Sequence, residues 1–247
     1  MANHDFRARR LYVAVDIQAG AEIVLDREQS NYLLKVLRLG SGAIVFLFNG
    51  RDGEWRARLE TTARSKASLL VEAQTRPQTA AGELAYAFAP LKHARLDYMV
   101  QKAVEMGAAK LTPVLTRHTQ VTRVNLDRMR ANVIEAAEQC GILSVPAVEE
   151  EVTFPRWLDA LAPERVVVFC DEEAGNKDPL AALARAPAGP LTVLVGPEGG
   201  FDETERRALL GRGRVVRLSL GPRILRADTA AVAALALVQA ARGDWRR

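Results

Sequence analysis

The chain has 247 residues, 49% of them hydrophobic and 26% charged, which predicts a soluble globular protein of one or two domains. Its best apolar run, residues 230–241, is too short to cross a membrane, and no secretory signal opens the sequence. Two cysteines without a disulfide pattern and three scattered histidines point to neither a disulfide scaffold nor a metal site, so we expect a cytoplasmic, metal-free protein.

Positive charge is concentrated in the first third of the chain. Residues 1–76 hold 12 Lys and Arg against 9 Asp and Glu, and so carry most of the net charge of +4. A basic module of this kind can bind a polyanion through its phosphates. An arginine-rich surface that binds nothing gives the same count, so charge alone leaves both interpretations open.

The first part of the chain has the pattern of β structure. Short apolar runs between glycine-bearing turns predict strands at residues 11–16, 21–26, 43–50, 54–60 and 67–73. Residues 27–39 have helical spacing instead, with an expected buried side of Tyr32, Leu33, Val36 and Leu37. We expect a small closed barrel with one helix, followed by a polar link that begins at residue 76.

After the link the rhythm changes to alternating strands and helices. Strands are predicted at residues 84–91, 110–115, 165–171, 191–196 and 214–221, and helices at residues 95–107, 125–141, 203–211 and 228–242. Several of the strands are continuous apolar runs, as parallel strands buried on both faces are. The alternation predicts an α/β sheet with helices on both sides, in a domain of residues 76–247 after a first domain of residues 1–75.

Two of the helices allow predictions about single residues. Lys102 and Glu105 stand three apart, where they pair on the helix surface or take part in a site. Cys140 falls on the expected buried stripe of its helix and precedes Gly141, which ends the helix. No histidine or other base is near it in sequence, so we expect a buried structural thiol.

The most informative segments are two glycine-proline loops. The first, LVGPEGGF at residues 194–201, follows a predicted strand, and ligands of α/β sheets bind outside the carboxyl ends of strands. It matches neither the phosphate loop of nucleotide triphosphatases nor the dinucleotide motif, and its acidic surroundings favour a zwitterionic or cationic ligand. An ordinary turn in which Asp202 caps the next helix is the alternative.

The second loop belongs to LGPRILRADTA at residues 220–230. Arg223 and Arg226 flank two apolar residues there, and a pair of guanidinium groups suits a phosphate or a planar polar base. A plain surface position for both is the alternative. Asp228 or Thr229 can cap the last helix by accepting a backbone N–H bond.

Taken together, four blocks resemble the ribosomal RNA small subunit methyltransferase E family of the SPOUT class. They are QKAVEMGAAKLTPVLTRHTQ, EAAEQCG, LVGPEGGFDETE and SLGPRILRADTA. The resemblance covers nearly the whole chain and implies S-adenosyl-L-methionine-dependent methylation of a uridine at N3 in 16S rRNA of the small ribosomal subunit. It also implies a PUA-like RNA-binding barrel, a SPOUT α/β knot threaded as a deep trefoil over residues 165–240, and a homodimer that pairs through the final helix.

In the family the knot loops hold the cofactor, mainly through backbone groups and small apolar contacts. Carried over to this chain, one wall of the cofactor site is Leu194, Gly196, Gly199 and Gly200, and the other is Leu218, Leu220, Gly221, Ile224 and Leu225. The glycines are expected because a side chain at these positions fills the place of the cofactor.

The implied reaction requires loss of the N3 proton and stabilisation of the charge that develops on the base. We expect Arg226 to face the uracil oxygens and Asp228 or Glu198 to take or relay the proton. RNA phosphates are expected to meet Arg223 and the cations of the barrel, namely Arg7, Arg9, Arg10, Lys35, Arg38, Arg56 and Arg58.

Two positions depart from the pattern of the family. Asp228 stands where glutamate is usual, which shortens the reach of the carboxylate by one methylene, and His118 stands where serine or cysteine is usual. Two other functions stay open: a SPOUT methyltransferase acting on tRNA or on a ribose 2′-hydroxyl, and a non-catalytic RNA-binding protein.

Overall fold

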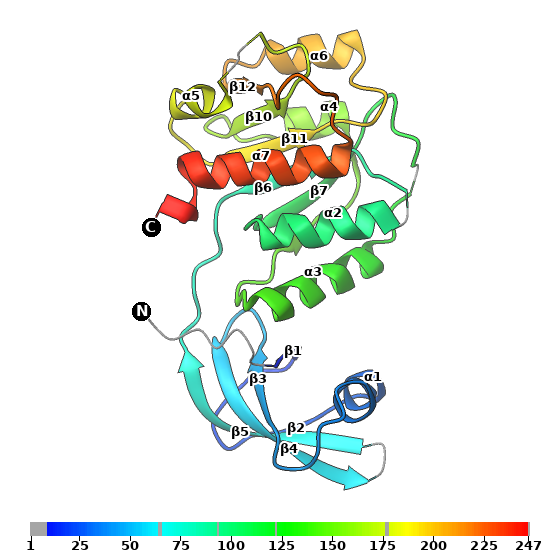
Figure 1. The fold of residues 1–247 in the computed structure, drawn as a ribbon, viewed down its shortest axis with the longest axis vertical. Coiled ribbons are helices and arrows are strands. Elements are labelled where there is room, and N and C mark those ends of the chain that lie inside the picture. Colours follow the sequence, from blue (N-terminus) through cyan, green and yellow to red (C-terminus); the bar gives the residue numbers. More distant parts are fainter. Residues whose placement is uncertain (1–8, 64–65, 93, 122, 176–177, 247) are drawn as a thin grey trace. The chain divides into compact units, whose positions relative to one another are not determined.

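The structure is a computed structural model that describes residues 9–63, 66–92, 94–121, 123–175 and 178–246. The chain divides into two compact units, which we call the N-terminal and the C-terminal unit (Figure 1). The N-terminal unit comprises Met1–Ala80 and Ala137–Val145, and the C-terminal unit comprises Ala81–Ala136 and Pro146–Arg247. The smaller unit therefore includes Ala137–Val145, which lies far along the sequence. The predicted division after residue 75 places this segment in the other domain.

The N-terminal unit is built on a five-stranded sheet with the strand order β1-β3-β4-β5-β2. The strands are β1 (Arg10–Tyr12), β2 (Glu22–Val24), β3 (Ile44–Phe48), β4 (Glu54–Ala63) and β5 (Lys66–Arg76). Strands β1 and β3 pair in parallel and the other neighbours are antiparallel. Among the described residues no pairing joins the edge strands β1 and β2, so the pairings form an open sheet where the sequence predicted a closed barrel.

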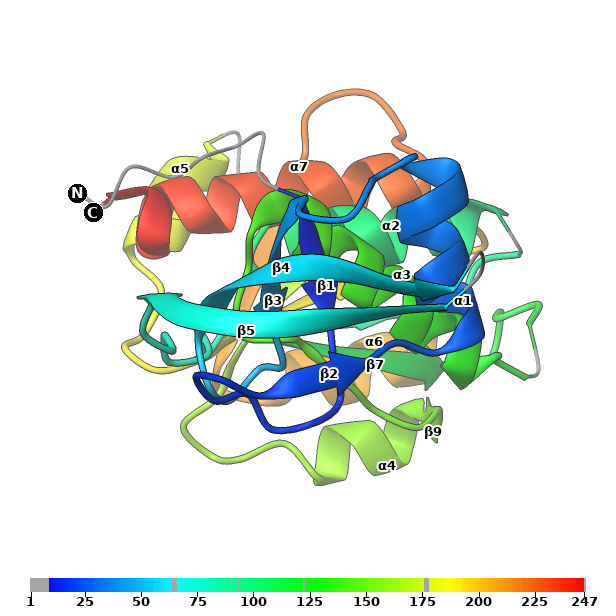
Figure 2. The ribbon, with the colours of Figure 1, turned by 90° about the horizontal axis from the view of Figure 1, so that it is seen from below.

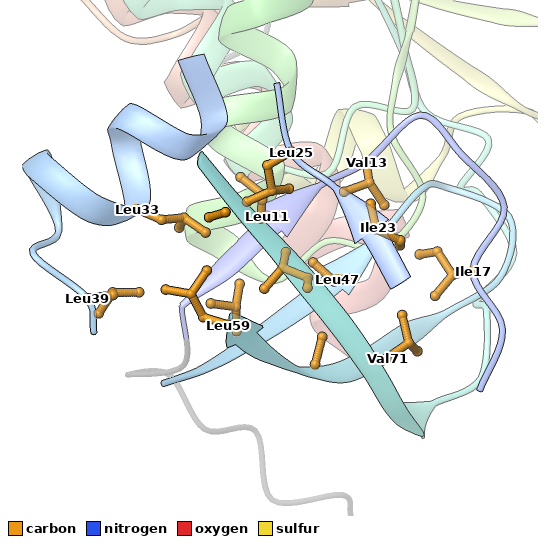
Figure 3. Packing of buried hydrophobic residues seen from close by; sticks show 14 residues of the cluster. Leu11, Val13, Ile17, Ile23, Leu25, Leu33, Leu39, Leu47, Leu59 and Val71 are labelled. Atoms are coloured by element: carbon orange, nitrogen blue, oxygen red, sulfur yellow. The ribbon is translucent and has the colours of Figure 1, made fainter. Parts of the chain in front are cut away.

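One face of this sheet carries the core of the N-terminal unit. In Figure 3 the side chains of Leu11, Leu47 and Leu59 from the strands gather with Leu33 from the helical segment. Strand β4 alternates as the sequence predicted, because Ala57 and Leu59 are buried and Trp55 is partly buried, while Arg56 and Arg58 are exposed. Removal of this apolar surface from water is the main contribution to the stability of the unit.

The predicted helix over residues 27–39 is present but changes its winding halfway. Helix α1 (Arg27–Asn31) continues as a π-helical turn, η1 (Tyr32–Val36), which closes with a hydrogen bond of 2.9 Å from Leu37 N to Tyr32 O. Leu33 is buried as expected, but the side chains of Tyr32 and Val36 are 39% and 61% exposed. Their predicted burial is wrong because the wider π turn changes the spacing of 3.6 residues that the pattern assumed.

The second segment of the N-terminal unit packs on Phe48. Ala137 and Leu143 cover this fully buried ring, and Tyr12 meets it edge-on with ring centroids 5.8 Å apart. Backbone N–H of Tyr12 also donates to a carboxylate oxygen of Glu138 at 2.8 Å. The C-terminal end of helix α3 (Leu126–Cys140) is thus an integral part of the smaller unit.

The C-terminal unit contains a seven-stranded, wholly parallel sheet. The strand order is β12-β10-β11-β6-β7-β8, and β9 pairs with β7 beside β8. The strands are β6 (Ala85–Phe88), β7 (Lys110–Leu115), β8 (Ala147–Val148), β9 (Val152–Thr153), β10 (Val166–Cys170), β11 (Leu191–Val195) and β12 (Val215–Leu218). Every residue of β6 and β11 is buried, as their continuous apolar runs predicted.

Helices cover both faces of this sheet, which confirms the α/β class. Figures 1 and 2 show α2 and α7 on one face and α4 and α6 on the other. The helices are α2 (Ala94–Glu105), α3, α4 (Phe154–Asp159), α5 (Pro179–Ala184), α6 (Glu203–Leu210) and α7 (Ala227–Arg242), with a final 3₁₀ turn η2 (Asp244–Arg246). Among the described residues, no helix combines the length and the apolar character needed to span a bilayer.

Candidate active site

Both glycine-proline loops leave the sheet of the C-terminal unit at the same edge. Because its strands are parallel, the loops after β6, β7, β10, β11 and β12 all lie at the carboxyl edge, where α/β proteins bind ligands. The first loop connects β11 to α6 and the second connects β12 to α7. The predicted catalytic residues Glu198 and Asp228 therefore lie at this edge.

A single arginine from helix α2 connects these two carboxylates. The guanidinium group of Arg95 donates one hydrogen bond to Glu198 and another, from Nε, to Asp228 Oδ2 at 3.1 Å. We call these three residues the Arg95 cluster. No pattern in the sequence singles out Arg95, because a charged residue in the first turn of a helix is ordinary and only folding brings it beside both loops.

The surroundings of Asp228 keep its carboxyl ionised. Burial alone would raise the pKa of Asp228, but hydrogen bonds from Arg95 and from the N–H of Thr229, with the charge of nearby Arg226, lower it below the ordinary value. Helix α7 begins at Ala227, with Arg226 as a cap residue that makes no side-chain capping bond. The predicted capping role thus falls to Asp228, from within the first turn of the helix.

His118, from the loop after β7, contacts the backbone of the first loop. Its Nδ1 lies 3.2 Å and 3.1 Å from the carbonyl oxygens of Gly199 and Gly200, so a proton on this nitrogen donates to the loop. Gly200 has φ of +70°, a conformation that favours glycine. Asp202 caps α6 in a reciprocal arrangement with Glu205, which confirms the structural alternative for that aspartate.

A small cavity of about 60 Å³ lies beside the Arg95 cluster, between the loops after β6, β7 and β11. Its lining includes three groups that carry or can carry positive charge, Lys92, Arg95 and His118, together with Glu198. This volume is well below the 300–1,000 Å³ that is typical of small-molecule sites. The cavity accommodates a single polar group rather than a whole nucleoside.

A second charged cluster at the same edge surrounds Asp171, the residue after β10. Its side chain has no exposed surface and accepts from Arg206 at 2.7 Å and from Arg217 at 2.5 Å. Burial alone would raise the pKa of Asp171, but these two guanidinium groups lower it. We call Asp171, Arg206, Arg217 and Glu173, which also pairs with Arg206, the Asp171 cluster.

The predicted first wall of a cofactor site is only partly open to a ligand. The side chain of Leu194 is fully buried in the core of the sheet, and Leu218 is fully buried as well. A Cβ on Gly196 would lie 2.5 Å from the ring of Phe201, so glycine is needed there for packing within the chain. Packing against Phe201 thus gives Gly196 a structural reason of its own, and its contact with a cofactor stays a prediction, while Gly199 and Gly200 lie at the loop surface.

The predicted second wall is an exposed loop. Gly221 has φ of +99° and open space where a Cβ would be, and Ile224 is 97% exposed. Leu220 and Leu225 are half-buried, and Arg223 and Arg226 are exposed. Arg95 pairs with Glu198 in the first loop and with Asp228 at the start of α7, just after the second loop. Among the ion pairs of the described residues, these two are the ones that link the two segments.

The predicted RNA-binding cations of the N-terminal unit differ in their environments. Arg10 is buried against Glu54 at 2.8 Å, which removes its side chain from the surface, so its assignment as an RNA contact is corrected. Both Arg56 and Arg58 pair with Glu72. Three others are exposed, namely Arg9, Lys35 and Arg38, and Arg7 lies outside the described residues.

The remaining sequence predictions concern one ion pair, the thiols and metals. Lys102 pairs with Glu105 at 2.6 Å, as one alternative had it. Cys140 is exposed, so its predicted burial is wrong: the buried stripe of α3 passes through Ala136 and Ala137 instead. Burial and nearby carboxylates raise the pKa of the Cys170 thiol to about 12. In the part of the chain that the structure describes, no group of His, Cys, Asp or Glu could hold a metal ion.

Comparison with known proteins identifies the class. A family model described as an RNA methyltransferase domain matches residues 78–239, and a second, described as an RNA methyltransferase PUA domain, matches residues 25–72. The protein is therefore a methyltransferase with an α/β catalytic unit and a PUA-like domain.

The relatives identify the family within this class. The chain is 30% identical to ribosomal RNA small subunit methyltransferase E of Rickettsia conorii over 93% of this chain and 94% of the relative. It is 32% identical to the Synechocystis protein of that name, over 94% of this chain and 78% of the relative. The chain belongs to the ribosomal RNA small subunit methyltransferase E family.

Two solved structures are similar along nearly the whole chain. The Neisseria gonorrhoeae ribosomal RNA small subunit methyltransferase E bound to S-adenosyl methionine is 26% identical with a TM-score of 0.81, covering 94% of this chain and 97% of that one. A Legionella pneumophila protein with bound SAM is 28% identical with a TM-score of 0.82, covering 95% and 98%. The fold described above is thus one that binds this cofactor in related proteins.

Proposed function

We propose that this protein uses S-adenosylmethionine to methylate N3 of a uridine in 16S rRNA of the small ribosomal subunit. Membership of the family carries the proposal, because the relatives are named for small-subunit rRNA and a similar structure holds the cofactor. The ion-paired carboxylates beside the glycine loop are the local observation that supports it.

The residues at the carboxyl edge suit this cofactor. Glu198, two residues before Gly200, and Glu172 are exposed carboxylates, and a Cβ on Gly200 would lie 3.6 Å from Glu172 Oε1. Such groups can pair with the positive charge of the cofactor, and exposed backbone at Gly199 and Gly221 can approach it closely. When bound, S-adenosylmethionine supplies a methyl group on a positively charged sulfur.

The roles of the side chains follow from their exposure and charge. Glu198 is about half exposed and can accept the N3 proton from a uracil, whereas Asp228 is only 16% exposed and holds Arg95 in place. Arg226 is exposed at the start of α7 and can stabilise negative charge on the uracil oxygens. Arg223 in the same loop is left to bind an RNA phosphate.

The finer architecture belongs to the same proposal. The chain from β10 to α7, residues 165–240, threads as a trefoil knot, with the catalytic domain at residues 76–247 after an RNA-binding domain at residues 1–75. A homodimer forms through α7, whose second apolar face is half-buried and includes Val232, Ala233, Ala236 and Leu237. Because its substrate is the ribosome, we place the protein in the cytoplasm.

The test is methyl transfer from labelled S-adenosylmethionine to small ribosomal subunits that lack the modification, with tRNA as the competing substrate. Mass spectrometry of the digested RNA is expected to show one N3-methyluridine. Label on tRNA or on a ribose hydroxyl would replace the proposal by the alternative methyltransferases. Absence of cofactor binding would favour a non-catalytic RNA-binding protein.

The assignment of Arg226 is tested by Arg226→Ala and compared with Arg223→Ala from the same exposed loop, which should weaken RNA binding but leave kcat at saturating RNA largely unchanged. We expect kcat to fall about 100- to 1,000-fold in the first variant, as for loss of one group that stabilises a developing charge. Affinity for the cofactor should stay unchanged. Full turnover in Arg226→Ala would show that another group faces the base.

A further inference from the structure

The π-helical turn η1 of the N-terminal unit presents an unusual surface. Its winding directs Leu33, and after the turn Leu39, into the core of the sheet (Figure 3). Tyr32 and Val36, four residues apart, are exposed instead. Single π turns inside helices occur frequently at functional sites. An exposed aromatic ring and an exposed branched side chain on one short segment need an explanation.

Arg38, just after this turn, adopts a backbone conformation that disfavours its side chain. Its φ of +55° is the only positive value for a residue other than glycine among the described residues. Glycine commonly occupies such positions at helix ends, because a Cβ disfavours this backbone conformation. Strain of this kind occurs where the side chain has a use that outweighs it. Arg38 is exposed to solvent.

The charges of this segment differ from those elsewhere in the unit. Arg10, Arg56 and Arg58 each already pair with a glutamate, although Arg56 and Arg58 share Glu72. No ion pair involves Lys35 or Arg38 among the residues that the structure describes. These two cations can therefore pair with an external anion at no loss of an internal contact.

The other exposed apolar residues of this unit lie beside acids. Val15 precedes Asp16, and Val24 lies on the same face of β2 as Glu22. Asp16 pairs with Arg51, which reduces its repulsion of a polyanion, whereas Glu22 beside Val24 repels one. Among the exposed apolar side chains of the described N-terminal unit, Tyr32 and Val36 are thus the ones that lie near cations without an ion pair, Lys35 and Arg38.

We propose that Tyr32, Lys35, Val36 and Arg38, which we call the Tyr32 surface, form a binding site for a single-stranded segment of RNA. A base stacks on the ring of Tyr32 and against Val36, and the phosphates on either side bind Lys35 and Arg38. Proteins that bind single strands combine cations with exposed aromatic rings in this way. The proposal rests on the RNA substrate of the proposed function and names the part of the N-terminal unit that contacts it.

The test uses the full-length protein and a fluorescently labelled single strand of uridines as probe. We expect Tyr32→Ala to bind the strand roughly 5- to 150-fold more weakly, the range for loss of one stacked base, while Tyr32→Phe stays within about twofold of wild type. Lys35→Gln and Arg38→Gly should each reduce the slope of log K against log salt by about 0.7.

The control variants separate this role from effects on folding or on total charge. Arg51→Gln removes an exposed cation that already pairs with Asp16 at 2.7 Å, and it should leave the salt slope unchanged. Arg38→Gly relieves the positive φ, so its thermal stability should be at least that of wild type although it binds RNA less well.

The proposal is overturned if Tyr32→Ala binds as tightly as wild type, if Tyr32→Phe loses as much as Tyr32→Ala, or if both cation variants keep the wild-type salt slope. Methyl transfer by the wild-type protein to unmodified small subunits is measured alongside. If the wild-type protein transfers methyl groups normally and the variants bind RNA as tightly as wild type, the proposed role of the Tyr32 surface is rejected and the proposed function stands. If the wild-type protein transfers no methyl group to small subunits but the variants lose binding as expected, the proposed function is rejected and the RNA-binding role of the Tyr32 surface stands.

Discussion

The Arg95 cluster and the Asp171 cluster lie at the same edge of the same sheet, yet they are built in opposite ways. In the Asp171 cluster a carboxylate without exposed surface lies at the centre of two guanidinium groups. In the Arg95 cluster a cation lies at the centre, its side chain is 35% exposed, and Glu198 is half exposed. Burial strengthens electrostatic interactions and makes a lost partner costly, whereas exposed groups stay available to a ligand. We therefore assign a stabilising role to the Asp171 cluster and a chemical role to the Arg95 cluster.

The largest effect is expected from Asp171→Ala. The change leaves Arg206 and Arg217 without their carboxylate, and it should lower the free energy of unfolding by about 3 kcal/mol, measured with urea. Glu173→Ala is the control, because it removes a mostly exposed partner of Arg206 and should cost much less. Equal losses in the two variants would contradict the difference in burial on which the comparison depends.

Arg95→Ala tests the other side of the comparison. It should reduce kcat about 100-fold, since Glu198 and Asp228 lose the group that positions both of them, while stability to urea changes little. Arg95→Lys keeps the charge but not the planar fork that serves two carboxylates, so it should recover activity only in part. If Arg95→Ala unfolds as easily as Asp171→Ala, the cluster is structural.

Acid should weaken the Asp171 cluster in a defined range. Because the pKa of Asp171 is lowered in the folded protein, the folded state binds fewer protons than the unfolded state. Its contribution to stability is complete above the unfolded pKa of about 4 and is lost as the pH falls through the lower folded value. Asp171→Asn should therefore show a flatter decline of stability below about pH 4 than wild type. A decline as steep as that of wild type would mean that other carboxylates dominate.

The smallest effect is expected from Asp228→Glu, which introduces the residue that the resemblance to the family predicts at this position. The longer side chain keeps the carboxylate beside Arg95, whose half-exposed side chain can adjust. We expect kcat to change by no more than about fivefold, equivalent to about 1 kcal/mol in the barrier. A larger loss, measured as initial rate at saturating cofactor, would show that this chain depends on the shorter reach of Asp228.

The sequence predicted most of the architecture because its signals were local. Period-two alternation in β4 and continuous apolar runs in β6 and β11 depend on the burial of each strand, which the structure confirms. The error at Tyr32 and Val36 has a physical cause, since residue spacing cannot distinguish α from π winding. Short elements such as α4, with six residues, are too brief to show a period.

The candidate site was harder to predict because its residues come from separate elements. The glycine loops could be found by their composition, but Arg95 and His118 act through contacts with residues about 80 to 130 positions away. Glycine at 196 has a structural cause, the ring of Phe201, which no local pattern contains. Resemblance to a family supplied the roles, and only folding shows which side chains are free to perform them.

The inclusion of Ala137–Val145 in the smaller unit affects how the protein can be dissected. A fragment that stops at residue 75 would expose the ring of Phe48, since Ala137 and Leu143 would be absent. The N-terminal unit is therefore not a transferable cassette: a fusion or a truncation that keeps it folded must also supply the end of α3 and the turn after it.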